Sequence, residues 1–448
     1  MKKRVLFISI PIIIIIAGMI VLGTLASIIT GYAAKNLASG IFVAGRTQES
    51  MEKEDLNFSL IRFTRNTVDM EKREVTSRFL FWKSKAIYID GFGCTVVRDF
   101  TEEEIRSRPY TKVALPAVNP DTLPWPVGDR LTDTIPPGIN MQKLEKFLSK
   151  AFSDTLPMRG TFAVAVAYKN QLVAERYRDD LSPNNLFLSW SIAKSFTNTL
   201  AGILESQRKI DINQPVVLNE WKNDQRATIT LADLLHMNSG LEWNEDYGNN
   251  SDVNKMLFKN GAMASYAINK PVEAPRDSLW YYSSGSTNIV CRLIRNAIAN
   301  DEEYYMLPRR ELFNRIGMRT AVFETDASGD FIGSSYVYAS MRDYVRYGLL
   351  YLNRGNWLGE QILPESWIDF TTTPASGSNG RYGASFWLNR NREYPGVPTD
   401  MYSCNGHNGQ HIFIIPSKEL VVVRMGFSPD KTFIPQVFLK GILNALEK

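Results

Sequence analysis

An almost unbroken run of apolar residues opens the chain. It extends from Val5 to about Thr30 and is interrupted only by isolated proline, serine and threonine residues. Because roughly 20 apolar residues are enough to cross a bilayer, the run predicts an N-terminal transmembrane helix, contained with its flank in residues 1–34. A cleaved signal peptide is the alternative, since Gly31-Tyr32-Ala33 resembles a cleavage site.

The charges on either side of this run predict its orientation. Three basic residues precede it at positions 2–4, and the next basic residue is Lys35. Positively charged flanks of a membrane span stay in the cytoplasm. We therefore expect a membrane-anchored protein whose main domain lies outside the cytoplasm, in the periplasm if the cell has an outer membrane.

The following hundred residues carry weaker patterns. Residues 35–50 are polar enough for a tether, and residues 51–105 mix charges with short apolar runs, which predicts a small accessory subdomain. Seven prolines lie within residues 108–137, a crowding that disfavours regular elements and predicts a strap over the next domain. We expect these parts to occupy residues 35–137 and the main domain to occupy residues 138–448.

Two predicted β-hairpins lie at opposite ends of the main domain. Their strands are residues 162–168 with 171–176, and residues 412–415 with 420–425. Helical periodicity predicts helices over 141–153 and 434–446, and further helical segments fill the middle. Strands from distant parts of the chain, with helices between them, predict an α+β fold in which helices flank an antiparallel sheet and a mainly helical lobe is inserted.

Size, charge and cysteine content narrow the possible functions. The chain has 448 residues, 44% of them hydrophobic, which is enough for a large core. The formal charge is +4, with no basic cluster interleaved with aromatic residues, so we expect no nucleic-acid partner. Three cysteines allow at most one disulfide, for which Cys94 and Cys404 are the candidates because Cys291 lies in an apolar helical pattern.

Ser191 and Lys194 lie three positions apart at the start of a long apolar helical segment, so their side chains share one face. Serine is a weak nucleophile until a base removes its proton, and lysine can be that base once its pKa is lowered. The same spacing recurs from Ser50, Ser206 and Ser428, but in polar or charged surroundings that leave the lysine protonated. The alternatives for the first pair are a helix-capping serine and a surface lysine.

Two later segments contain the other groups that such chemistry needs. Tyr282 precedes an apolar helix predicted over 289–298, where a phenol can pass a proton to a leaving group, although Tyr281 is an alternative. Residues 406–410, Gly-His-Asn-Gly-Gln, open an apolar strand whose edge can lie beside the serine and supply an oxyanion donor.

The serine, lysine, tyrosine and glycine-bearing strand follow one another along the chain in this order. In this respect the chain resembles the serine β-lactamase and penicillin-binding protein superfamily. The chain is most similar to its class C-like branch of esterases, D-amino-acid peptidases and 6-aminohexanoate-dimer hydrolases. Three further segments support the resemblance, which covers roughly residues 140–446: Asp233–Leu241, Arg342–Gly348 and Tyr382–Trp387. The resemblance implies a β-lactamase-like fold.

The resemblance also implies roles for individual residues. Ser191 becomes the nucleophile, Lys194 its base, and Tyr282 the proton shuttle to the leaving group and later from water. The backbone N–H groups of Ser191 and Gln410 become the oxyanion hole. Tyr247, in Glu245-Asp246-Tyr247-Gly248, resembles the tyrosine that 6-aminohexanoate-dimer hydrolases place over the substrate amide.

Two departures from the family pattern affect the expected substrate. The usual Tyr-Ser-Asn is Tyr282-Ser283-Ser284, and the usual Lys-Thr-Gly is His407-Asn408-Gly409, which we expect to contact substrate. Loss of the strand lysine removes the cation that binds a substrate carboxylate. An uncharged small ester or amide is therefore the expected substrate.

We thus expect a serine hydrolase that forms an acyl-enzyme without a metal or cofactor. His407 and His411 are four positions apart, but Gly409 intervenes and the second histidine begins a strand, so they predict no metal site. The alternative is a non-catalytic module that kept the fold in order to bind peptidoglycan or a protein. The sequence contains no Gly-x-Ser-x-Gly, which argues against an α/β-hydrolase.

Overall fold

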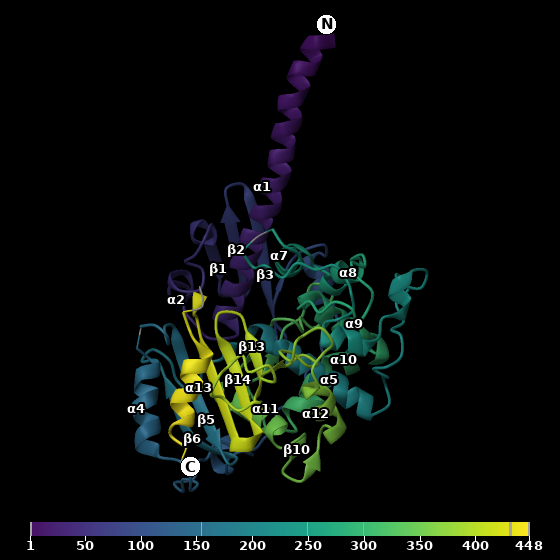
Figure 1. The fold of residues 1–448 in the computed structure, drawn as a ribbon. Helices are drawn as coiled ribbons and strands as arrows, with labels where there is room; N and C mark the ends of the chain where they lie inside the picture. The colour runs from purple at the N-terminus through teal and green to yellow at the C-terminus, as the bar shows by residue number, and fades with distance from the viewer. Residues whose placement is uncertain (1, 154, 249, 299, 430–431, 447–448) are drawn as a thin grey trace.

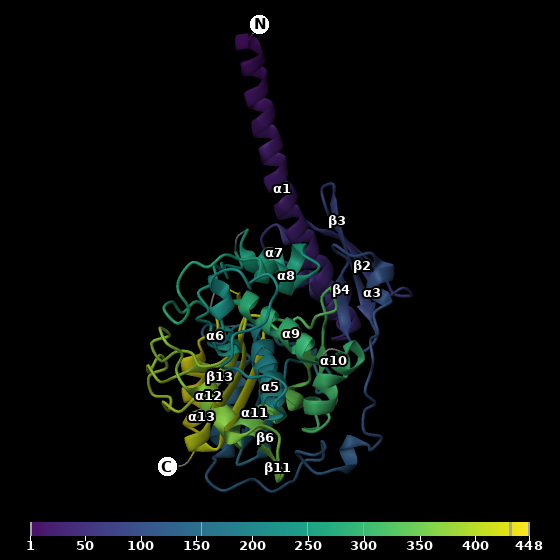
Figure 2. The same ribbon diagram turned by 90° about the vertical axis from the view of Figure 1, so that its right-hand side faces the viewer.

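A long N-terminal helix, α1 (Lys2–Phe42), begins the fold. The computed structural model describes residues 2–153, 155–248, 250–298, 300–429 and 432–446, and the side chains of this helix from Leu22 onward. The first half of α1 projects from the body of the molecule, and the second half enters it between the accessory sheet and the helices of the main domain (Figures 1 and 2).

The predicted transmembrane anchor is wrong. Within the part of the chain that the structure describes, no helix is long and apolar enough to cross a membrane. The end of the apolar run packs into protein instead: Ala26, Ile28 and Ile29 are buried. The expected membrane-anchored localisation, from which the placement outside the cytoplasm was derived, is therefore not supported.

Close packing and buried side chains hold the second half of α1. A Cβ added to Gly31 would lie 2.1 Å from the carbonyl oxygen of Phe258, in helix α7 (Asp252–Lys259), so the two backbones approach within a distance that only glycine permits. Residues 35–42, expected to begin a polar tether, continue the helix, and Leu37 and Ala38 are fully buried.

A buried ion pair also fixes α1 to the main domain. Lys35 and Glu324 form a salt bridge, with side chains 1% and 0% exposed. Glu324 also accepts hydrogen bonds from the Ser39 hydroxyl at 2.8 Å and from the backbone N–H of Cys94 at 2.6 Å. Since Cys94 belongs to strand β4 (Gly93–Val96), one carboxylate joins the helix, the accessory sheet and the main domain.

Removing one partner of this pair should destabilise the protein strongly. We expect Lys35→Met to lower the free energy of unfolding by about 3–5 kcal/mol, because Glu324 would remain buried without its counter-ion. The measurement is urea unfolding followed by circular dichroism. Adding Glu324→Gln should restore most of the loss, and a single variant as stable as the wild type would contradict the docking of α1.

The accessory region contains a small antiparallel sheet that lies against α1. Its strands, in spatial order, are β1 (Arg65–Asp69), β2 (Glu74–Phe79), β3 (Trp82–Ile89) and β4. Helices α2 (Gln48–Lys53) and α3 (Glu102–Arg106) precede and follow it. The proline-rich segment after α3 forms one short 3-10 turn among its described residues, and Arg346 of the main domain binds the carbonyl oxygens of Pro126 and Gly128 at 2.8 and 2.7 Å.

A six-stranded antiparallel sheet organises the main domain. Its strands, in spatial order, are β12 (Trp387–Leu388), β13 (Tyr402–Gly406), β14 (Gln410–Ile415), β15 (Leu420–Gly426), β5 (Thr161–Tyr168) and β6 (Gln171–Tyr177). The two predicted hairpins, β5–β6 and β14–β15, meet where β15 pairs with β5. The predicted α+β fold, with a sheet built from distant parts of the chain, is confirmed.

Helices cover both faces of this sheet because the central strands are apolar on both sides. Val164 and Val166 face α4 (Met141–Ala151) and α13 (Pro435–Leu443), while Ala163 and Ala165 face the larger core on the side of α11 (Met341–Leu352). In Figure 1, α4 and α13 lie on one side of β5 and β14, and α11 on the other.

The segment between the two hairpins forms the helical lobe. Its helices besides α7 and α11 are α5 (Ala193–Ser206), α6 (Leu231–His236), α8 (Met263–Ile268), α9 (Ser284–Ile298), α10 (Asp301–Leu307) and α12 (Glu365–Thr372). Its short strands are β7 (Phe187–Leu188), β8 (Val322–Phe323) and β9 (Val337–Ala339), which form one sheet, and the pair β10 (Asn356–Trp357) and β11 (Glu360–Gln361).

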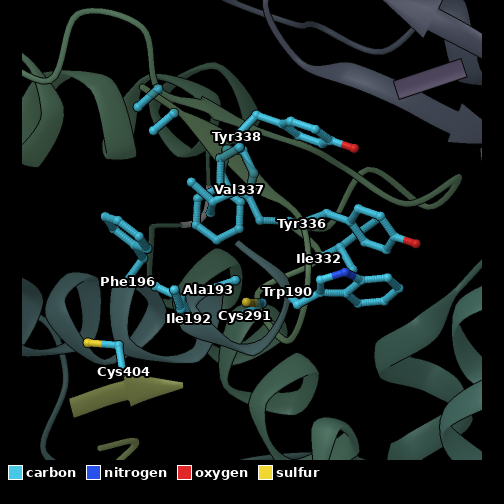
Figure 3. Packing of buried hydrophobic residues seen from close by; sticks show 14 of the residues in the cluster. Trp190, Ile192, Ala193, Phe196, Cys291, Ile332, Tyr336, Val337, Tyr338 and Cys404 are labelled. Carbon is cyan, nitrogen blue, oxygen red and sulfur yellow. The ribbon is translucent and has the colours of Figure 1, made fainter. Parts of the chain in front are cut away.

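The three cysteines are free thiols. Cys94, Cys291 and Cys404 are each buried, and none forms a disulfide. Figure 3 shows Cys291 and Cys404 at separate places in the packed core around α5.

Candidate active site

Ser191 lies in a short 3-10 turn, η3 (Trp190–Ile192), that leads directly into α5. The preceding residue, Trp190, has a φ of +46°, a left-handed conformation that is unusual for a large side chain and typical of functional sites. Packing holds it there: the Trp190 ring lies 6.4 Å from that of Tyr32 in α1 and 5.8 Å from that of Tyr336. Figure 3 shows Trp190 beside Tyr336. Helix α1 therefore supports the turn that carries Ser191.

Lys194 reaches Ser191 from the first turn of α5. Its ammonium nitrogen, Nζ, lies 3.0 Å from Ser191 Oγ, 2.9 Å from Ser284 Oγ and 3.0 Å from the carbonyl oxygen of Ser334. The side chain is almost completely buried, at 1% exposure. The predicted pairing of serine and lysine is therefore present in the structure, in an environment that excludes water.

A neighbouring carboxylate determines how these hydrogen bonds are directed. The Ser284 hydroxyl donates to Glu245 Oε1 at 2.5 Å, and the backbone N–H of Ser284 donates to Glu245 Oε2 at 2.9 Å. Having donated its only proton to Glu245, the Ser284 hydroxyl accepts from Lys194. The Ser334 carbonyl can only accept. A neutral Lys194 has two N–H bonds, and both are used, so its lone pair faces Ser191.

Burial also favours this neutral form. It lowers the pKa of Lys194 to about 8 from its ordinary value of 10.5, and the negative charge of Glu245 opposes the shift. Roughly a tenth of the amine is therefore unprotonated at pH 7, and about half at pH 8. The arrangement is suited to removing a proton from the serine hydroxyl.

Tyr282 completes the cluster from the segment just before α9. Its ring centroid lies 4.8 Å from Lys194 Nζ. Burial raises the pKa of Tyr282 well above its usual range, with a smaller opposing effect from a hydrogen bond to Ser191. The phenol therefore keeps its proton. Tyr281 is the more exposed of the two neighbouring tyrosines, at 45%, and no contact in the described structure links it to Lys194.

The glycine-bearing segment lies beside the serine as a hairpin turn rather than as the start of a strand. Residues 407–409 connect β13 to β14, and Gln410 is the first residue of β14. A Cβ on Gly406 would lie 2.2 Å from the carbonyl oxygen of Ser189, which shows how closely the end of β13 approaches the turn before Ser191. This approach brings the backbone of Gln410 to the same side of the site as that of Ser191.

A buried arginine supports this turn from beneath. The guanidinium of Arg424 donates to the carbonyl oxygen of Gly409 at 2.7 Å and to Ser428 Oγ at 2.7 Å. Asn408 and Gly409 both have positive φ, at 59° and 90°, a conformation that favours glycine or asparagine over β-branched residues. The sequence pattern gave no signal for Arg424, because it lies in the middle of an apolar strand.

Tyr247 and His407 meet over the site. Their rings stack at 4.6 Å with an interplanar angle of 19°, and both lie near Trp190, at 6.0 and 5.3 Å. The Tyr247 hydroxyl is buried without a hydrogen-bond partner in the described structure, although the hydroxyls of Ser284 and Ser335 lie nearby. Burial lowers the pKa of His407 to about 4, so its imidazole is neutral at neutral pH.

The structure thus brings together the residues that the sequence singled out. Ser191, Lys194 and Tyr282 converge, and the 407–410 turn and Tyr247 adjoin them. Two groups that direct the hydrogen bonds of Lys194 were missed in the sequence. Glu245 lies two positions before Tyr247, in a loop already selected, but only the fold shows that its carboxylate points at Ser284. Ser334 acts through its backbone, for which side-chain patterns give no signal.

Comparisons with known proteins show the family and the fold of the chain. The family model described as Beta-lactamase matches residues 154–429. The 6-aminohexanoate-dimer hydrolase of Paenarthrobacter ureafaciens is 21% identical over 318 residues, which cover 64% of this chain and 75% of the relative.

Solved structures share the fold at lower identity. A family VIII carboxylesterase has a TM-score of 0.55 and 15% identity, covering 71% of this chain and all of that one. A penicillin-binding protein homologue from Caulobacter crescentus has a TM-score of 0.53 and 14% identity, with the same coverage. The family model covers well over half of the sequence, and its serine and lysine segments fall inside the match. This chain therefore belongs to the Beta-lactamase family, as a hydrolase of the β-lactamase-like fold.

Proposed function

We propose that this protein is a serine hydrolase that cleaves an ester or amide bond of a small, uncharged substrate through an acyl-enzyme. Ser191 is the nucleophile, Lys194 the base and Tyr282 the proton shuttle. The backbone N–H groups of Ser191 and Gln410 form the oxyanion hole. The relation to a 6-aminohexanoate-dimer hydrolase and the likeness to a carboxylesterase support this class of reaction.

The observation that carries the proposal is the hydrogen-bond pattern of Lys194. Its contacts with Ser284 and Ser334 consume both N–H bonds of a neutral amine, which leaves the lone pair 3.0 Å from Ser191 Oγ. That distance is within the range for proton transfer between a nucleophile and its base. A purely structural lysine would gain nothing from a buried, unprotonated state.

Acylation begins when Lys194 takes the proton of Ser191 and Oγ attacks the substrate carbonyl carbon. The carbonyl oxygen becomes an oxyanion held by the two backbone N–H groups. Tyr282 donates its proton to the leaving oxygen or nitrogen as the bond to carbon breaks, and it recovers a proton from Lys194. The leaving group departs as an alcohol or amine, and Ser191 carries the acyl group.

Deacylation reverses these proton transfers with water in place of the leaving group. Water attacks the acyl carbon, and its proton passes through Tyr282 to Lys194. Lys194 then returns a proton to Ser191 Oγ as the acyl–oxygen bond breaks. The raised pKa of Tyr282 suits it to both steps, because it ionises only transiently.

The groups facing the nucleophile favour an uncharged substrate. His407 replaces the family's strand lysine and is neutral at neutral pH because burial lowers its pKa to about 4. His407, Asn408 and Gly409 therefore offer substrate contacts without a cation. The unpaired Tyr247 hydroxyl is a buried donor, which a substrate carbonyl or amide would satisfy.

The proposal is tested by comparing turnover of p-nitrophenyl acetate, a D-amino-acid amide, a linear amide dimer and a chromogenic β-lactam. We expect a burst of p-nitrophenol equal to the enzyme concentration, and slower or no hydrolysis of the carboxylate-bearing β-lactam. A folded protein that shows no burst and no turnover would contradict the proposal and favour a binding role.

The charge of Glu245 should influence the pH above which the enzyme is active. Its negative charge raises the pKa of Lys194, so Glu245→Gln should lower that pKa. The acid limb of kcat/KM, expected near pH 8 in the wild type, should move to lower pH. Loss of the directed Ser284 hydrogen bond should also lower the maximum by about 10-fold or more.

The matched control is Asp246→Asn, which removes the same charge from the adjacent, exposed residue. It should leave the pH profile within about 0.2 units of the wild type, because solvent screens exposed charges. If both variants gave the wild-type profile, Glu245 would have no influence on Lys194.

A further inference from the structure

An apolar cavity lies between α1 and the main domain, next to the candidate oxyanion hole. Its volume is about 60 Å³. From the main domain its walls include Trp190, the residue before Ser191, and Gln410, whose N–H is the second oxyanion donor. From the accessory region they include Tyr32, Asn36 and Ala44. Helix α1 therefore closes a space that the catalytic domain alone would leave open.

We propose that this cavity binds the acyl chain of the substrate, and that the acyl group is an unbranched, uncharged carbon chain. This inference rests on the proposed function. It means that α1 and the segment after it help to select the substrate.

The position of the cavity indicates that it holds the acyl group of the substrate rather than the leaving group. In the tetrahedral intermediate the oxyanion points at the N–H groups of Ser191 and Gln410, while the leaving atom must lie beside Tyr282 to receive its proton. Of the described residues, those that line the cavity include Trp190, directly before Ser191, and Gln410, on the oxyanion side of the site, but not Ser191, Lys194 or Tyr282 themselves. The chain that enters the cavity is therefore the part that stays bound to Ser191.

The charged residues in the cavity wall are already paired with one another, which favours an uncharged acyl chain. Arg46 pairs with Asp55 and, at 2.7 Å, with Glu54, and Arg178 pairs with Glu54 at 3.1 Å. Both guanidinium groups also lie over the ring of Phe162, at 5.6 and 4.5 Å from its centroid. Each of these charges is already compensated, so a charged chain would find no free counter-ion and would lose its hydration. The rest of the wall is mainly leucine, phenylalanine, tyrosine and tryptophan.

The small volume of the cavity favours an unbranched chain of a few carbons. A volume of 60 Å³ holds about four water-sized spheres, which suits a slim chain and excludes a ring or a branched group. Leu186, from the segment before β7, and Ala44, from the turn after α1, both line this space. The size of these two side chains therefore limits what the cavity accepts.

The test measures kcat/KM for p-nitrophenyl acetate, hexanoate and octanoate. In the wild type we expect hexanoate to exceed acetate. Ala44→Leu, which narrows the cavity, should lower the hexanoate-to-acetate ratio about 10-fold, and Leu186→Ala, which widens it, should raise the octanoate-to-hexanoate ratio by a similar factor. Because each ratio is taken within one protein, a partly unfolded preparation does not change it.

The control is Leu293→Ala, the same truncation at a partly buried leucine of α9 outside the cavity wall. It should leave both ratios unchanged. If acetate is hydrolysed and all four proteins give the same ratios, the cavity does not bind the acyl chain, and the proposed function stands without it. If the wild type hydrolyses no ester, the proposed function fails and this inference fails with it.

Discussion

Replacing Ser191 with alanine should lower kcat for p-nitrophenyl acetate by about 10⁴-fold or more and abolish the burst. The reason is that Ser191 is the proposed nucleophile, while the other hydroxyl beside Lys194, that of Ser284, donates its proton to Glu245. The residual rate should therefore reflect only the oxyanion hole and substrate positioning. The measurement is pre-steady-state absorbance at matched concentrations of folded protein. The fold should persist, because the substitution removes one hydroxyl from a turn that is held by aromatic packing around Trp190.

The chain provides its own control for this substitution. Ser206 and Lys209 repeat the Ser-x-x-Lys spacing at the other end of α5. Ser206→Ala should therefore retain wild-type turnover. A Ser191→Ala protein that still gave a stoichiometric burst would place the nucleophile elsewhere.

The second large effect is expected at Lys194. Lys194→Met keeps the length of the side chain but removes the base, and general-base catalysis contributes about 10²–10⁴-fold. We therefore expect a fall in kcat/KM of about 10³-fold. The pH dependence should change as well. In the wild type, kcat/KM should rise with pH until the pKa of Lys194, about 8, is passed, because only the neutral amine accepts the serine proton.

In Lys194→Met this acid limb should disappear, and the remaining rate should follow hydroxide concentration. The control is Lys209→Met, which should leave both the rate and the pH profile unchanged. An acid limb near pH 8 that survived in Lys194→Met would mean that another group titrates there.

Much of the main domain was predictable because its signals are local. The hairpin over β5 and β6 follows from two β-rich runs around Lys169 and Asn170, and both of these turn residues have positive φ. The helix that begins with Met141 was predicted from its apolar periodicity. The pairing of β15 with β5 joins residues more than 250 positions apart, and only the assumption of one sheet linked them beforehand.

The N-terminal helix shows where local pattern is insufficient. A run of apolar residues fits a bilayer and a protein core equally well, since both remove side chains from water. What distinguishes them here is tertiary: Gly31 permits close contact with α7, and Lys35 finds Glu324 far along the chain. Neither contact has a signal in the apolar run itself.

The sequence predicted which residues form the candidate site, but not how their hydrogen bonds are directed. Ser191, Lys194 and Tyr282 were selected from spacing, context and family resemblance. The direction of the Lys194 lone pair depends on the Glu245 carboxylate and on the Ser334 backbone, which lie in other segments. A hydrogen-bond network of this kind is defined only after the fold brings its members together.

The central claim, that a neutral Lys194 activates Ser191, is tested most directly by the rate of phosphonylation with an alkyl fluorophosphonate across pH 6–10. The modified residue is mapped by mass spectrometry in the wild type and in Lys194→Met. We predict one adduct, on Ser191, whose rate of formation rises with pH through about 8 in the wild type and loses that dependence in the variant. Modification of another residue, or the same pH dependence in both proteins, would contradict the account.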